Sequence, residues 1–212
     1  MKYLLLLFLL SCAGYSFKEK SNPFSQFGIK SLSIPMFYNR TNFANVSGVF
    51  TKEIFQTLSE FNKLMIYTGN KNTDAVLLGI LESPQKSKES TITIGRKSVQ
   101  NTFGDDIIGE NRRDFPLPTT NEIQLQLRLI VIKNPTPEEI DFFQKDITAD
   151  AISSKIIFNE VIALRNSFIL AELDQNGTEV LGSQNRGIKK NAISQMAINA
   201  ANSFKDMILY AF

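Results

Sequence analysis

Alternation of apolar and polar residues predicts the best-defined strand of this chain. In residues 122–132 every second side chain is apolar, and the side chains between them are polar. A strand places successive side chains on opposite faces, so this pattern indicates a strand with one buried and one wetted face. The buried set is Ile123, Leu125, Leu127, Leu129 and Val131, and the polar set is Glu122, Gln124, Gln126 and Arg128. We expect this strand to lie near the centre of the sheet.

Shorter patterns predict further strands before residue 122. Residues 28–37 place Leu32, Ile34 and Met36 on one face and Ser31 and Ser33 on the other, with a proline near the strand end. A polar turn over 38–42 should follow. Residues 64–68 form a short strand, residues 74–83 are apolar on both faces as in an inner strand, and residues 91–94 alternate. Residues 97–120 have the composition of a long loop or a loosely paired extension.

The last third of the chain predicts two strands and a hairpin. Residues 156–164 and 167–173 read as separate strands. Asn176-Gly177 is a strong turn signal between apolar runs, so residues 178–181 should pair back on residues 168–173.

Helical spacing of apolar residues predicts two long helices. In residues 46–60, and in residues 191–210, apolar side chains recur three and four positions apart. Pro137 opens a brief third helix through Phe143. The apolar stripe of the first helix is Val46, Val49, Phe50, Ile54, Leu58 and Phe61, and that of the last is Ile193, Met196, Ala197, Ala200, Phe204, Met207, Ile208 and Ala211. This order predicts an α+β fold, a mostly antiparallel sheet with two helices packed on one face.

The first residues have the features of an export signal ending at Cys12. A basic start is followed by seven consecutive apolar residues over 4–10, too few for the roughly 20 that span a bilayer as a helix. Leu9-Leu10-Ser11-Cys12 resembles the lipoprotein box, in which the cysteine is acylated. A thiolate accepts an acyl group readily, and firm anchoring needs more than one chain. A small buried cysteine is the alternative, but its place at the end of a signal favours lipid attachment. We expect a signal peptide over 1–11, a lipidated tether over 12–27 and one domain over 28–212.

Composition excludes several classes of chemistry. The chain has no histidine, and Cys12 is its only cysteine. Ser-His-Asp and Cys-His catalysis, histidine acid/base work and the usual zinc sites are therefore absent. The formal net charge of +2 gives no general case for nucleic-acid binding. We expect neither an enzyme nor a cofactor.

These residues together resemble the LptE-like family of lipopolysaccharide-assembly lipoproteins. The resemblance rests on Cys12-Ala13-Gly14-Tyr15-Ser16-Phe17, on the stretch from Ile34-Pro35 to Thr41, on residues 74–80, and on the alternating strand and terminal helix. It implies a sheet with two helices, attachment on the periplasmic side of the outer membrane, and an LptD-like β-barrel partner. The family plugs this barrel, assists its assembly and helps deliver lipopolysaccharide. Residues 134–155, with two prolines, depart from the family pattern.

Basic residues are the expected contacts for an anionic lipid. The candidates are Arg96, Lys97, Arg112, Arg113, Lys189 and Lys190. Acidic residues balance the first four, so a solvated loop of mixed charge is the alternative. The two lysines precede the expected last helix, at the end where a helix dipole disfavours cations. The alternative function is a periplasm-facing structural or protein-binding lipoprotein that carries no lipid.

Overall fold

A seven-stranded mixed sheet with two helices on one face forms the domain. The computed structural model describes residues 21–69, 72–84, 91–99, 115–145, 154–171 and 181–211. The strands are β1 (Ser31–Ile34), β2 (Tyr38–Asn39), β3 (Met65–Thr68), β4 (Ala75–Glu82), β5 (Thr91–Val99), β6 (Phe115–Lys133) and β7 (Ile156–Ile169). The helices are the short η1 (Ser25–Phe27), α2 (Val46–Ser59), α4 (Pro137–Lys145) and α5 (Leu181–Ala211). The predicted α+β class is confirmed.

Strand β6 is the axis of the sheet. Strands β4 and β5 pair antiparallel with its two halves along one side, and β7 pairs antiparallel along the other. Strands β1 and β2 join parallel to β4, and β3 joins parallel to β1. The five apolar side chains predicted for the buried face of β6 are all fully buried. The predicted central position of this strand is therefore confirmed.

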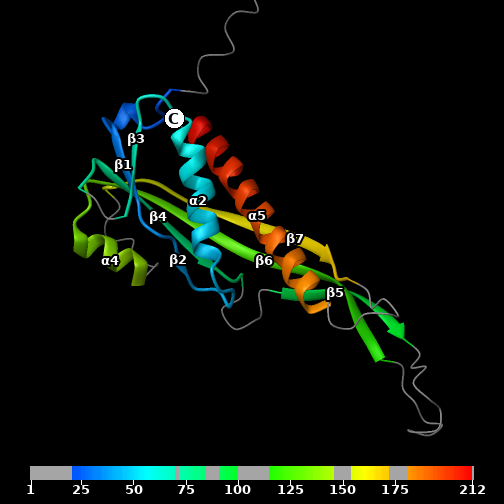
Figure 1. Ribbon diagram of the computed structural model, residues 1–212. Helices are drawn as coiled ribbons and strands as arrows, with labels where there is room; N and C mark the ends of the chain where they lie inside the picture. The colour runs from blue at the N-terminus through cyan, green and yellow to red at the C-terminus, as the bar shows by residue number, and fades with distance from the viewer. Residues whose placement is uncertain are drawn as a thin grey trace, which may run out of the picture.

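Helices α2 and α5 cover the same face of the sheet (Figure 1). They run in the same direction, because Lys189 near the start of α5 lies over Phe43, just before α2, while Lys205 pairs with Glu60 at the end of α2. Phe50, Ile54 and Phe204 are fully buried between these helices and the sheet. Most of each predicted stripe is buried, although Ala211 is exposed at the end of α5.

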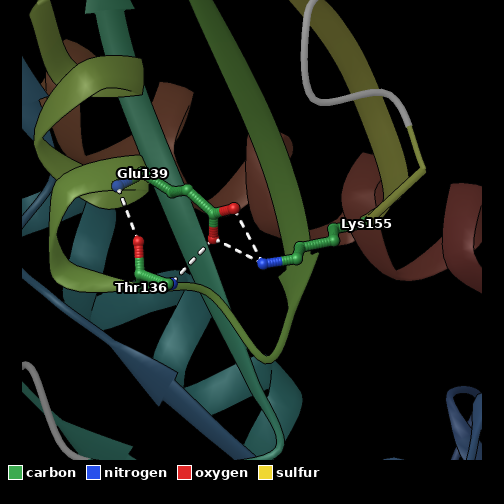
Figure 2. A network of polar contacts seen from close by, with 3 residues as sticks. All are labelled: Thr136, Glu139 and Lys155. Atoms are coloured by element: carbon green, nitrogen blue, oxygen red, sulfur yellow. Dashed lines mark hydrogen bonds and ion pairs between the residues drawn. The ribbon is translucent and has the colours of Figure 1, made fainter.

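The third helix, α4, packs on the opposite face. Phe143 shares a small core there with Val76, Leu78, Ile130 and Ile132. Figure 2 shows how α4 begins: the Thr136 amide donates to Glu139 Oε2 at 2.7 Å, and the Glu139 amide donates to Thr136 Oγ1 at 3.3 Å. This reciprocal pair is a capping box. Lys155 Nζ donates to Glu139 Oε1 at 2.7 Å, which ties the start of α4 to the chain entering β7.

Several strand boundaries differ from the expected ones in the first half of the chain. Met36 is 66% exposed rather than on a buried face, because β1 ends at Ile34, just before Pro35. Ser33 is buried rather than exposed, and its hydroxyl donates to the Gly69 carbonyl. Part of the expected turn over 38–42 pairs as β2. In the expected loop over 97–120, β5 continues to Val99 and β6 begins at Phe115, so the paired-extension interpretation holds at both ends.

The last third of the chain differs more. The two strands expected over 156–164 and 167–173 are one strand, β7, because Arg165 and Asn166 continue the pairing with β6. The expected hairpin is contradicted at its far end, since Leu181 already belongs to α5. Residues 172–180 lie outside the described residues. The last helix starts at Leu181 rather than near Asn191.

Candidate interaction surface

The expected lipid attachment site, Cys12, lies outside the described residues. The described chain starts at Ser21, and its packing begins within the expected tether. Phe24 is fully buried, and Asn22 Nδ2 donates to the Ile29 carbonyl at 2.7 Å. The apolar Phe24 side chain thus joins the core before the expected domain boundary at residue 28.

The six basic candidates are not gathered into one cluster within the described part of the chain. Arg112 and Arg113 lie outside it. Arg96 is exposed on β5 opposite Pro118, and the Lys97 backbone pairs with Leu117. Lys189 and Lys190 lie inside α5 rather than before it, so the expected placement at a helix start is wrong. Lys189 Nζ lies 4.4 Å from the Phe43 ring centre, a cation–π contact that joins α5 to the segment just before α2.

A polar surface follows β6 on the face away from α2 and α5, and we call this side of the sheet the far face. Four half-buried polar side chains of β6 lie there and alternate along the strand with the fully buried apolar set. They are Glu122, Gln124, Gln126 and Arg128. Gln124 Nε2 donates to Glu122 Oε1. The predicted two-sided character of β6 is confirmed.

Sequence reasoning missed Arg40, which lies beside this surface and forms an ion pair. Arg40, just after β2, lies 3.2 Å from Glu82 of β4, and its guanidinium stands 5.6 Å above the Tyr38 ring. The register places Ile80 of β4 between Tyr38 and Arg128. Arg128 Nε is buried and has no hydrogen-bond partner among the described residues. Only the strand register brings these residues together, because they come from distant parts of the chain.

Apolar side chains are also exposed on the far face. Ile92 and Ile94 of β5 are 44% and 55% exposed, and Val161 and Ile169 of β7 are 42% and 71% exposed. Of the three helices α2, α4 and α5, only α4 packs on this face, and it covers the end of the sheet near Ile130 and Ile132. Exposed apolar residues mark a contact surface only where they are contiguous, and these four lie on the two strands that flank one half of β6.

The described residues hold little that would support other chemistry. No group of three acidic or thiol side chains with metal-ligand spacing occurs among them. No helix within the described ranges is long and apolar enough to cross a bilayer. The far face presents arginine, amide and isoleucine side chains.

Comparison with known proteins gives similarity to solved structures alone. No protein-family model and no curated protein matches the sequence. A protein of Caulobacter crescentus named as a lipoprotein is 6% identical, with 83% of this chain and 88% of that one covered, at a TM-score of 0.42. Rare lipoprotein B of Shewanella oneidensis is 12% identical, with coverage of 85% and 92% and a TM-score of 0.34. A lipoprotein of Neisseria meningitidis is 7% identical, with coverage of 76% and 96% and a TM-score of 0.33. Likeness at this level carries nothing about function, which has to be argued from the residues.

Proposed function

We propose that this protein is a lipid-anchored lipoprotein of the outer membrane, on its periplasmic side, that assists assembly of an LptD-like β-barrel and plugs it for lipopolysaccharide delivery. Cys12 at the end of the export signal supplies the anchor. The sequence resemblance to LptE-like proteins supplies the partner. The alternative is a structural lipoprotein that binds an envelope protein without lipid cargo.

The observation that carries the proposal is the difference between the two sheet faces. Helices α2 and α5 cover one face. The far face presents the polar side chains of β6 beside Arg40 and Arg165. The lumen of a large outer-membrane barrel is polar and wet, so a plug needs a polar outer surface rich in hydrogen-bonding groups. The far face offers amide and guanidinium donors with a few exposed isoleucines between them.

Lipopolysaccharide contacts are assigned to the same six basic residues. Lipid phosphates accept charge-assisted hydrogen bonds from arginine and lysine. The Lys189 ammonium already lies over Phe43, whereas Lys190 and Arg96 are exposed. Arg96 and Lys190 are therefore the first of the six to substitute.

Depletion tests the role in cells. Removal of the protein should lower both the folded amount of the barrel and the lipopolysaccharide at the cell surface, while unrelated outer-membrane proteins persist. If both levels stay normal, the structural-lipoprotein alternative replaces this proposal.

A pair of matched variants tests the face. Gln126→Trp places a bulky side chain on the far face, and Gln56→Trp places the same side chain on the exposed side of α2. Co-purification of the barrel should fall with Gln126→Trp and persist with Gln56→Trp. The reverse result would indicate that the barrel contacts the helices, and would contradict the assignment of the barrel contact to the far face.

A further inference from the structure

Strand β7 forms a long edge of the sheet. It has 14 residues, about 46 Å of extended chain, and among the described residues it pairs with β6 alone. The other strands with a single described partner are shorter: β5 has nine residues, β3 has four and β2 has two. Strands of the β7 kind present a row of backbone donors and acceptors that another chain can use.

Backbone direction identifies the groups on this open edge. The Leu170 amide donates to the Thr119 carbonyl at 2.8 Å and continues the register in which Ile169 faces Thr120. Hydrogen-bonded pairs alternate along an antiparallel ladder, so Phe168, Asn166, Leu164 and Ile162 also direct their amides at β6. The residues between them direct their amides outward, and these are Val161, Ala163, Arg165, Ser167 and Ile169.

The outward residues lie at the surface. All five are exposed, and their side chains point to the far face. The next outward amide, that of Ala171, donates to Asn185 Oδ1 of α5 at 2.8 Å. The open part of the edge thus ends where α5 caps it.

The sequence of β7 has little of the usual protection of an edge. Natural sheets block edge pairing with charged side chains, lysine above all, or with proline, bulges or short strands. The charged residues of β7 are Glu160 and Arg165. Residues 157–169 contain neither lysine nor proline, and the only register shift against β6 lies at the start of the strand. Two large apolar side chains, Val161 and Ile169, stay exposed along it.

The packing of α5 restricts what fits this edge. On the helix face α5 follows β7, because Asn166 Nδ2 donates to the Ala192 carbonyl at 3.0 Å and the Phe158 and Phe204 ring centres lie 5.4 Å apart. A second copy paired antiparallel would bring its own α5 above a strand about 4.8 Å away. Two packed helices need about 8–10 Å between their axes. A second copy would therefore crowd two α5 helices together, whereas a single extended segment carries no helix.

We propose that the β7 edge accepts an extended segment of a partner protein as an added strand, with an acidic residue of the segment opposite Arg165 and apolar residues opposite Val161 and Ile169. Backbone hydrogen bonds supply the affinity of such strand addition, and alternate side chains supply its specificity. Arg165 is exposed and is the cation among the outward residues, so charge selects an acid at that position. This inference does not depend on the barrel role.

Binding of a defined peptide to the full-length protein in detergent tests the proposal. The probe is Val-Thr-Thr-Thr-Glu-Thr-Thr-Thr-Val, which alternates so that its glutamate and both valines share one face. The matched control has lysine in place of glutamate. Fluorescence anisotropy should show saturable binding of the first peptide, and the lysine peptide should bind about tenfold or more weakly. Absence of saturable binding, or equal binding of both, would overturn the proposal.

Residue-resolved hydrogen exchange distinguishes strand addition from other docking. The acidic peptide should slow exchange at the Ala163, Arg165 and Ser167 amides and leave the inward amides unchanged. Binding without this protection would overturn the proposal. Protection that appears without peptide and grows with protein concentration would show a second copy on the edge and would also overturn it.

A proline variant provides the matched control within the chain. Ala163→Pro removes an outward amide and keeps the bonds to β6, so the fold should persist while peptide binding is lost. Ala163→Ser keeps the amide and should bind as the parent does. Retained binding by a folded Ala163→Pro protein would contradict pairing at this edge. If the proline variant does not fold, Arg165→Glu takes its place. This variant should lose binding of the acidic peptide and gain binding of the lysine peptide.

Discussion

Close contacts of single residues show why some positions have one residue type. Gly79 lies in the middle of the buried strand β4, and a Cβ there would stand 2.4 Å from Cγ of Phe37. The Phe37 ring therefore occupies the space that a side chain at position 79 would need. The sequence marks Gly79 as unusual within an apolar strand, yet it cannot show which ring covers it, because that depends on how β2 approaches β4.

Gly79→Ala should lower the free energy of unfolding by about 1–3 kcal/mol through overpacking. The control is Gly48→Ala in α2, where a Cβ meets nothing within 4 Å and alanine should stabilise the helix by about 0.5–1 kcal/mol. Urea unfolding of both variants checks the pair. Equal effects of the two substitutions would show that the Phe37 contact is unimportant.

Asp74 should make stability depend on acid pH. Its Oδ2 accepts hydrogen bonds from the Lys30 and Ser31 amides, each at 2.9 Å, and those bonds lower the pKa of the carboxyl below its ordinary 3.8. A lowered folded-state pKa contributes stability above the unfolded pKa, and this contribution is lost as the pH falls through the folded value. Stability should therefore drop below pH 4, and the drop should be smaller in Asp74→Asn. Urea midpoints between pH 2 and pH 7 measure it, and identical slopes would contradict this role.

Observed helices and strands match the sequence prediction where one face of the element is apolar. They differ from it where contacts with residues far along the chain decide the structure. Strand β6 and helix α2 match their predicted patterns, since burial on one face fixes both. The first turns of α5 were missed because Gly182 and Gly187 and many polar residues hide any stripe there. The polar residues Arg165 and Asn166 predicted a break between two strands, where the structure has the continuous strand β7. The Asn166 side chain is accommodated there by a hydrogen bond to α5, a partner that no local sequence pattern reveals.

Glu139→Ala should loosen α4 and the start of β7 together. It removes the acceptor for the Thr136 amide and for Lys155, at a cost of about 1 kcal/mol, typical of a lost helix cap. Glu138→Ala, an exposed neighbour in the same helical turn, is the control and should have a smaller effect. Hydrogen exchange of α4 measures both variants. Unchanged exchange in Glu139→Ala would rule out the tie seen in Figure 2.

Phe204→Ala should be among the most damaging single changes in α5. The side chain is fully buried against Phe158, so its removal leaves a cavity and costs about 3–5 kcal/mol. Tyr210 on the same helix is 90% exposed, and Tyr210→Ala should change stability by less than about 0.5 kcal/mol. Thermal and urea unfolding compare the two. A Phe204→Ala protein as stable as the parent would mean that the stripe does not form the core.

Considered as a whole, the molecule combines an expected anchor with a domain whose two faces differ. The class of fold was predictable, because apolar spacing alone distinguishes helices from strands. The far-face arginines and the open β7 edge were not, since each depends on which strands become neighbours. The candidate surface therefore came from sheet register, and the lipid site stays a prediction from the signal sequence.

Cys12→Ser should release the protein from the membrane or leave its signal uncleaved. The expected reason is that serine does not accept the acyl chains that hold the protein there. Membrane fractionation and intact mass of the mature protein measure the result, with Ser11→Ala as a neighbouring control. A parent protein whose mature mass shows no acyl chains would contradict the anchor.

The pairing of α5 with α2 has a consequence for the order in which the chain can fold. Lys205 and Glu60 meet across 145 positions, and the 31-residue α5 is the last of the described elements. A chain that is synthesised from its amino end thus carries the apolar faces of α2 and β6 uncovered until α5 is complete. Long-range closure of this kind is slow and leaves incomplete chains prone to aggregation. The export that residues 1–12 predict would therefore require the chain to be held unfolded, or shielded, until α5 is free.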